Sequence, residues 1–251
     1  METNYFIEVA YKGSKYSGFQ KQLNAATVQG EIEKALEMVC RTSFNFTGSS
    51  RTDAGVHAKQ NYFHVVTPFT ITEKHIYQAN AVLPNDIVIK SVTPVTAEKH
   101  SRFDAVNRRY EYTITQLKNP FLTDSAFFIP VGIDWTLMQT AAAFVQTQTN
   151  FESFCKRNVQ VFTYECTLYR SEWIQREPHV WVYHVQGNRF LRGMVRALVA
   201  TMLRVGKQQM TLTEFAQVFE AKNCALADFS APPQGLCLCE VNYPSGYFTS
   251  V

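Results

Sequence analysis

Long uncharged apolar runs are absent from this sequence of 251 residues. The most apolar stretch, Gly193 to Val205, is interrupted by Arg196 and Arg204 and is shorter than the roughly 18 uncharged residues of a membrane span. The first residues, Met1 to Asn4, lack the basic segment that precedes the apolar stretch of a secretory signal. We therefore expect a cytoplasmic protein with no transmembrane helix.

Cysteine pairs with metal-ligand spacing are also absent. None of the six cysteines belongs to a Cys-x-x-Cys pair, and Cys237 and Cys239 are spaced as two residues on one face of a strand. The six histidines show no ligand spacing either. We expect the cysteines to be packing thiols and predict no metal site.

A large excess of charge of one sign is missing as well. The formal net charge of +3 is too small to identify a nucleic-acid-binding protein by itself. The arginines are nevertheless clustered, in the two groups Arg102, Arg108, Arg109 and Arg189, Arg192, Arg196. With 46% hydrophobic and 18% charged residues, the composition excludes disordered and fibrous classes, and the length allows one large or two small domains.

The order of predicted elements repeats along the chain as strand, helix, strand, strand, helix, strand. The first series is expected at Tyr5–Tyr11, Thr27–Cys40, Phe44–Thr47, Gln60–Val66, Thr72–Val82 and Asp86–Val92. The second is expected at Arg109–Gln116, Asp134–Gln148, Thr167–Gln175, His179–Gln186, Gly193–Val205, an extra helix Thr213–Ala221 and a last strand Gly235–Val241. The expected class is α+β.

Two such series favour two ferredoxin-like halves that share a mostly antiparallel central sheet, with flanking helices and an active-site cleft between the halves. We expect the halves to span residues 1–100 and 107–251, with the boundary near Ala97 to Asn107. The first half would carry the loop described next, and the second would carry the Arg109 strand and the Arg196 helix.

The densest group of chemically active side chains lies between two predicted strands, from Gly48 to Ala58. This segment contains Arg51, Asp53 and His57 among small residues. It is read either as a simple turn, because Asp and Gly favour turns, or as a loop that presents a carboxylate nucleophile to a ligand.

The sequence pattern alone does not decide the roles of two further residues. Arg196 lies in a helix that is apolar around its circumference, so it needs a carboxylate partner or must reach solvent from the first helical turn. Tyr110 shares a strand face with Tyr112, where aromatic residues are usually part of the core.

The segment Arg51 to Ala58, Arg-Thr-Asp-Ala-Gly-Val-His-Ala, resembles the active-site signature of the TruA-type tRNA pseudouridine synthases. Further segments that resemble this family follow in the same order: Tyr11 to Gln22 with Thr27 to Gly30, Arg102 to Tyr112, and Gly187 to Arg196. The resemblance extends from about residue 5 to Tyr243 and so covers nearly the whole chain.

This resemblance implies an isomerase that converts uridine to pseudouridine in the anticodon arm of tRNA, without cofactor or metal. Asp53 would be the catalytic aspartate, Arg196 its ion-pair partner, and Tyr110 the residue against the flipped base. Arg51 would occupy the space that the base vacates. The family is homodimeric, so a homodimer is expected.

Other roles stay open at this stage. Arg102, Arg108 and Arg109 would either contact RNA phosphates or form a solvated cluster. Ser50 and Arg192 depart from the family pattern beside the site, which leaves the choice of uridines undetermined. His57 has no role beyond closing the loop, and the sequence does not decide whether Asp53 attacks C1′ or promotes elimination.

Two other classes of function compete with the isomerase. A catalytically silent RNA-binding module would need the basic residues but not Asp53. A hydrolase would need Asp53 and His57 to act on the same water molecule.

Overall fold

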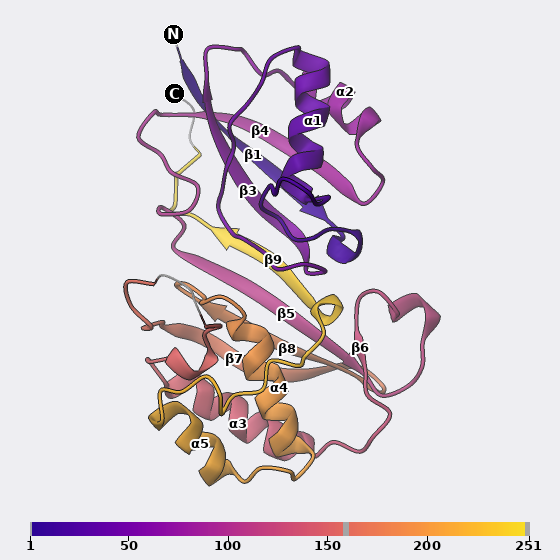
Figure 1. Ribbon diagram of the computed structural model, residues 1–251, viewed down its shortest axis with the longest axis vertical. Helices are drawn as coiled ribbons and strands as arrows, with labels where there is room; N and C mark the ends of the chain where they lie inside the picture. Colours follow the sequence, from indigo (N-terminus) through magenta and orange to yellow (C-terminus); the bar gives the residue numbers. More distant parts are fainter. Residues whose placement is uncertain (1, 158–160, 249–251) are drawn as a thin grey trace. The chain divides into compact units, whose positions relative to one another are not determined.

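The computed structural model describes residues 2–157 and 161–248, and the chain divides into two compact units (Figure 1). The first unit consists of Met1–Val106 and Cys237–Val251, and the second of Asn107–Leu236. The elements of the first unit are β1 (Thr3–Tyr11), α1 (Val28–Cys40), β2 (Thr47–Gly48), β3 (His57–Thr67), α2 (Glu73–Val82), β4 (Ile87–Val95) and β9 (Leu236–Asn242). Those of the second are β5 (Asn107–Thr115), β6 (Phe127–Phe128), α3 (Trp135–Thr147), β7 (Leu168–Glu177), β8 (Val180–Gly187), α4 (Met194–Gly206) and α5 (Leu212–Glu220).

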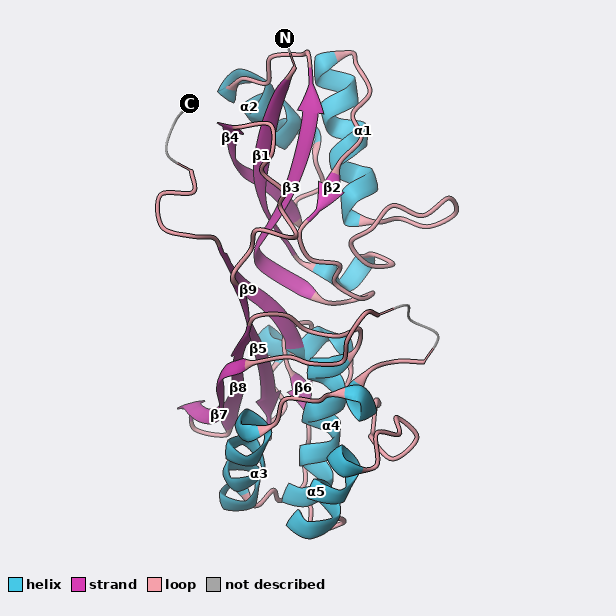
Figure 2. Cartoon of the chain, turned by 90° about the vertical axis from the view of Figure 1, so that its left-hand side faces the viewer, coloured by secondary structure: helices cyan, strands magenta, loops and turns pink. Residues whose placement is uncertain are grey.

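The sheet of the first unit is built around β1, which pairs antiparallel with β3 on one side and β4 on the other. The far edge of β3 pairs with β2 near Phe63 and with β9 near His57, the latter in parallel. Figure 2 shows α1 and α2 together on one side of these strands. β4, β1, β3 and β9 follow one another in the strand order and β2 also pairs with β3, so the β2–β3 connection ends beside β9.

The helices of the first unit begin at the residues that the sequence favours. Thr27 accepts a hydrogen bond from the Gly30 amide at the start of α1, and Thr72 accepts one from the His75 amide at the start of α2. α1 ends at Arg41, which adopts the left-handed conformation with φ 54°.

Strand β1 is buried on both faces, although its sequence alternates as a strand with one solvent-exposed face would. Ile7 and Val9 are fully buried. On the other face, the rings of Tyr243, Tyr247 and Phe248 pack against Phe6. The C-terminal segment therefore supplies a second apolar cover for the central strand.

The strands of the second unit also pair mostly antiparallel. β8 pairs antiparallel with β5 and β7, and the short β6 pairs parallel with β5. Helix α4 contacts both α3 and α5, and all its residues except Arg196 and Arg204 are buried. The Ser171 hydroxyl joins sheet to helix, because it donates to the Ala142 carbonyl of α3 and also contacts the Tyr183 hydroxyl.

The α+β class with mostly antiparallel strands and flanking helices is confirmed in both units. The strand expected at Phe44–Thr47 is wrong: only Thr47 and Gly48 pair with β3, whereas Phe44 and Phe46 are buried against other aromatic rings without ladder hydrogen bonds. Phe44 and Phe46 alternate with polar residues, and this pattern favours a strand in the sequence. β6 was not predicted, since two residues carry no periodicity. In the described part of the chain, no helix combines the length and apolar character needed to cross a bilayer.

His64 on β3 makes the stability of the first unit dependent on pH. Burial, reinforced by the neighbouring His100, lowers its pKa to about 4, and Asp104 opposes this shift only in part. Between about pH 6.5 and pH 4, the unfolded chain thus binds a proton at His64 that the folded chain does not bind. The contribution of His64 to the free energy of unfolding is therefore fully present above about pH 6.5 and is lost as the pH falls toward 4.

We expect the free energy of unfolding in urea to be lower at about pH 5 than at about pH 7, and the difference to shrink in His64→Gln. His179→Asn is the matched control, because His179 is exposed and its φ of 65° suits asparagine. Equal pH dependence in His64→Gln and the wild type would contradict the assignment.

Candidate active site

Asp53 lies in the loop between β2 and β3, where its side chain is half-buried. Arg51 is exposed on one side of it, and Thr52 between them is buried. The segment reverses direction at Ala54 and Gly55, with Gly55 at φ 80°. The turn interpretation and the functional one are therefore compatible, because the half-buried Asp53 immediately precedes the turn.

The backbone on both sides of Asp53 is fixed by hydrogen bonds. The Thr52 carbonyl accepts from the Phe19 amide at 3.1 Å, and the Asp53 carbonyl accepts from the Val56 amide at 3.1 Å. The Gly55 amide donates to the Tyr16 carbonyl at 3.3 Å. The segment that follows β1 thus holds the loop, so its path does not depend on the loop residues alone.

His57 closes this loop at the start of β3. It is buried, and its Nδ1 accepts a hydrogen bond from the Gly13 amide at 3.1 Å. One of its two ring nitrogens is therefore engaged in fixing the loop and is not a base for water, which argues against a hydrolase that uses that nitrogen.

Buried side chains support the same loop and were not singled out from the sequence. The Tyr11 hydroxyl lies 2.7 Å from Thr52 Oγ1, and Asn61 donates to the Ser50 carbonyl at 2.9 Å. Asn61 also donates to the Tyr11 hydroxyl at 3.3 Å. A buried Asn in a strand is the only local signal that could have drawn attention to this group.

In the second unit, Tyr110 lies on β5 on the same face as Tyr112. Tyr110 is half-buried, with its ring edge-on to Phe190 at 5.0 Å between centroids. Tyr112 is fully buried and donates to the Pro232 carbonyl at 2.8 Å; burial raises its pKa, which Arg196 partly offsets. Tyr112 is thus a core residue, as expected, whereas Tyr110 keeps an accessible edge.

Arg196 lies in the first turn of α4, which begins after Gly193 in the left-handed conformation. Its Nε donates to the Ala231 carbonyl at 2.7 Å. This bond fixes the direction of the guanidinium, which lies near Tyr112. The prediction that the helix around Arg196 is largely buried is confirmed.

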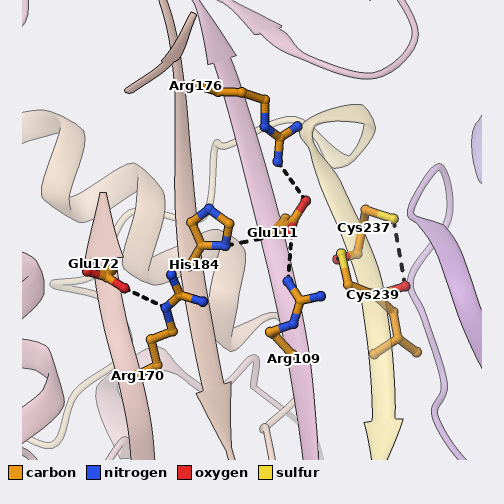
Figure 3. Close-up of polar contacts among 9 residues, drawn as sticks. Arg109, Glu111, Arg170, Glu172, Arg176, His184, Cys237 and Cys239 are labelled. Carbon is orange, nitrogen blue, oxygen red and sulfur yellow. Dashed lines mark hydrogen bonds and ion pairs between the residues drawn. The ribbon is translucent and has the colours of Figure 1, made fainter. Parts of the chain in front are cut away.

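Arg109 points to the opposite face of β5 from Tyr110, because successive side chains of a strand alternate. It donates to Glu111 at 2.7 Å, and Glu111 also accepts from Arg176 at 2.9 Å (Figure 3). His184 lies 3.6 Å from Glu111, and burial lowers its pKa despite that carboxylate. The structure therefore brings Arg196 to the face of Tyr110 and places Arg109 in an ion-pair cluster on the other face.

Arg102 and Arg192 are both exposed. Arg102 follows β4 and lies over the ring of Phe103, 5.7 Å from its centroid. Arg192 precedes α4, and its carbonyl accepts from the Lys156 amide at 3.0 Å.

A cavity of about 280 Å³ in the second unit contains none of the predicted site residues. It is lined by Glu152, Cys155, Lys156, Arg157, Tyr164, Lys222, Asn223 and Cys224. All six cysteines are free thiols, as expected, and burial raises the pKa of Cys155. Among residues 2–157 and 161–248, no three or more His, Cys, Asp or Glu side chains gather as a metal-ligand set.

Gly13 is required for the loop to take this path, since a Cβ there would lie 2.0 Å from the Val56 carbonyl oxygen. We expect Gly13→Ala to lower the free energy of unfolding by roughly 1–3 kcal/mol and to increase amide hydrogen exchange across residues 48–58. Gly132→Ala is the control: nothing lies within 4 Å of the place that its methyl group would take, so a change within about 0.5 kcal/mol is expected. Equal unfolding midpoints for the two variants would refute the close approach.

Comparison with known proteins agrees with this geometry. A family model described as tRNA pseudouridine synthase matches residues 7–104 and 143–244. The tRNA pseudouridine synthase A of Porphyromonas gingivalis is 37% identical over 252 residues, covering 97% of this chain and 98% of that protein. Those of Parabacteroides distasonis and Staphylococcus aureus are both 38% identical, over 97% and 92% of this chain and 97% and 89% of their own lengths. Asp53 and Arg196 fall within the matched ranges and Tyr110 lies between them, and the chain belongs to the tRNA pseudouridine synthase family.

Proposed function

We propose that this protein isomerises uridine to pseudouridine in the anticodon stem-loop of tRNA, with Asp53 as the catalytic residue. The observation that carries the proposal is the Asp53 loop itself. It presents a half-buried carboxylate whose flanking peptide groups are fixed by hydrogen bonds, within a segment that has the family's signature. A fixed carboxylate is what a reaction at a sugar carbon needs, because misplacement of the reacting atoms is costly.

The reaction breaks the bond from N1 of uracil to C1′ of the ribose, turns the base, and forms a bond from C5 to C1′. One proton leaves C5 and one is taken up at N1, so no atom is gained or lost and the proposal calls for no cofactor or metal. Asp53 acts at the ribose, either as a nucleophile that attacks C1′ or as the base that promotes elimination of the uracil.

Residues of both units complete the proposed site. Tyr110 lies against the flipped base, and the terminal nitrogens of Arg196 pair with Asp53 and keep it ionised. Arg51 fills the space that the base leaves in the stack. The exposure of Arg51, the accessible edge of Tyr110 and the fixed direction of Arg196 support these roles.

Two ferredoxin-like halves, residues 1–100 and 107–251, with the active-site cleft between them, are part of the same proposal. The pairing of β1 with β3 and β4 and of β2 with β3 in the first unit, together with the contact between α1 and α2, supports it. We also propose a homodimer, in which one tRNA contacts both subunits, and a cytoplasmic location, where tRNA is modified.

Arg102 and Arg109 are the proposed contacts to RNA phosphates. The exposure of Arg102 supports its role. Arg109 would use guanidinium donors other than the one bound to Glu111, since an arginine has five.

Asp53→Asn separates the isomerase from its alternatives. The amide keeps the shape of the carboxylate but loses its charge and nucleophilicity. We expect release of tritium from uridine labelled at C5 of tRNA to fall below detection, while tRNA affinity in filter binding stays within about tenfold of wild type, or about 1.4 kcal/mol.

Asp124→Asn, the same change at an exposed position of the second unit, is the control and should release tritium as the wild type does. Normal tritium release from Asp53→Asn would reject the catalytic assignment. Absence of release from the wild type would favour a binding module, and release of free uracil would favour a hydrolase.

The salt dependence of binding tests Arg102 and Arg109. Each phosphate contact releases counterions, so each Arg→Ala change should reduce the slope of log K against log salt by about 1. Lys74→Ala removes an exposed cation of α2 and should leave the slope unchanged. A wild-type slope in Arg109→Ala would assign Arg109 to the Glu111 cluster alone, and a wild-type slope in both would remove both from the RNA surface.

A further inference from the structure

We propose that Tyr11 and Asn61 are positioning residues that set the place of Asp53, although neither needs to touch the substrate. The inference rests on the proposed role of Asp53. It comes from a buried hydrogen-bond network that joins two strands of the first unit to Ser50 and Thr52, on either side of Arg51, and it concerns side chains to which the family resemblance assigns no role.

Thr52, the residue before Asp53, is held at two atoms. Its carbonyl accepts from the Phe19 amide at 3.1 Å, and its Oγ1 lies 2.7 Å from the Tyr11 hydroxyl. Tyr11 is the last residue of β1 and is 4% exposed, so this contact anchors the loop to the central strand of the unit. With its side chain and its peptide group both held, Thr52 fixes where the Asp53 backbone begins.

Asn61 completes the network from β3. It is fully buried, and its Nδ2 donates to the Ser50 carbonyl at 2.9 Å and to the Tyr11 hydroxyl at 3.3 Å. Its Oδ1 accepts from the Tyr62 amide at 2.9 Å, which fixes the orientation of the amide group. The Tyr11 hydroxyl therefore contacts both Asn61 and Thr52, and joins the two strands to the loop.

The network has a geometric consequence for catalysis. It lies in a buried setting, where hydrogen bonds are strong and an unpaired group is costly, so loss of one member displaces the loop to find new partners. A displacement of about 1 Å in a reacting group costs about 100-fold in rate. Contacts to RNA outside the loop are not affected by this displacement.

The test compares Tyr11→Phe with Tyr62→Phe in the full-length protein. Tyr62 is a matched control because it is buried in the same strand pair, and its hydroxyl also makes two hydrogen bonds, to Glu8 at 2.8 Å and from Gln60 at 3.0 Å. We expect kcat for tritium release to fall by about 10- to 100-fold in Tyr11→Phe, with KM for tRNA within about twofold of wild type. Tyr62→Phe should lower the urea midpoint by a similar amount and keep kcat.

Thr52 supplies an independent pair of variants. Thr52→Val replaces the hydroxyl by a methyl group and should lower kcat as Tyr11→Phe does, whereas Thr52→Ser keeps the hydroxyl and should retain most of kcat. The double variant Tyr11→Phe/Thr52→Val should be no slower than either single one, because both remove the same hydrogen bond.

A kcat for Tyr11→Phe within about twofold of wild type, or additive effects in the double variant, would overturn the positioning role. Equal losses of kcat in Tyr11→Phe and Tyr62→Phe would also overturn it, since that pattern indicates lost stability alone. Failure of the proposed function is a separate result, because it is detected by normal tritium release from Asp53→Asn.

Discussion

The first unit depends on the requirement that buried polar groups find partners. The loop that carries Asp53 crosses a region where the side chains of Tyr11 and Asn61 and the imidazole of His57 are buried. Each is satisfied by a bond to the loop or to the segment after β1. The same bonds that remove these desolvation costs also fix the path of the loop, so the stability of the fold and the placement of the carboxylate have one physical origin.

In the second unit, different charged groups lie on the two faces of β5. On the face of Tyr110 and Tyr112, a hydrogen bond to the Ala231 carbonyl fixes the direction of the Arg196 guanidinium. On the opposite face, Arg109 and Arg176 share the Glu111 carboxylate. The alternation of side chains along β5 thus keeps the guanidinium of Arg196 apart from a carboxylate that would compete for it.

The chain has a small net charge but carries its arginines in groups, and it belongs to the tRNA pseudouridine synthase family. This grouping fits the phosphate contacts proposed above, because contacts to RNA phosphates need local positive charge and not a large net charge. Arg102 is exposed beside Phe103, which supports the contact proposed for it.

The sequence by itself determined the elements and the signature. Helix caps at Thr27, Thr72 and Asp134 and the alternation in the long strands are local signals, and the structure follows them closely. The alternation at Phe44 and Phe46 led to a wrong prediction, because burial by aromatic neighbours produces the same sequence pattern as strand pairing.

Only the tertiary structure decided which groups meet. The bond from Asn61 to Ser50, that from Gly13 to His57, and the Arg109–Glu111–Arg176 cluster join residues whose partners are set by strand register and chain crossing. No local sequence pattern specifies the strand register that brings these residues together. For the same reason, the sequence could place Asp53 in a loop but could not reveal that Tyr11 on another strand holds it there.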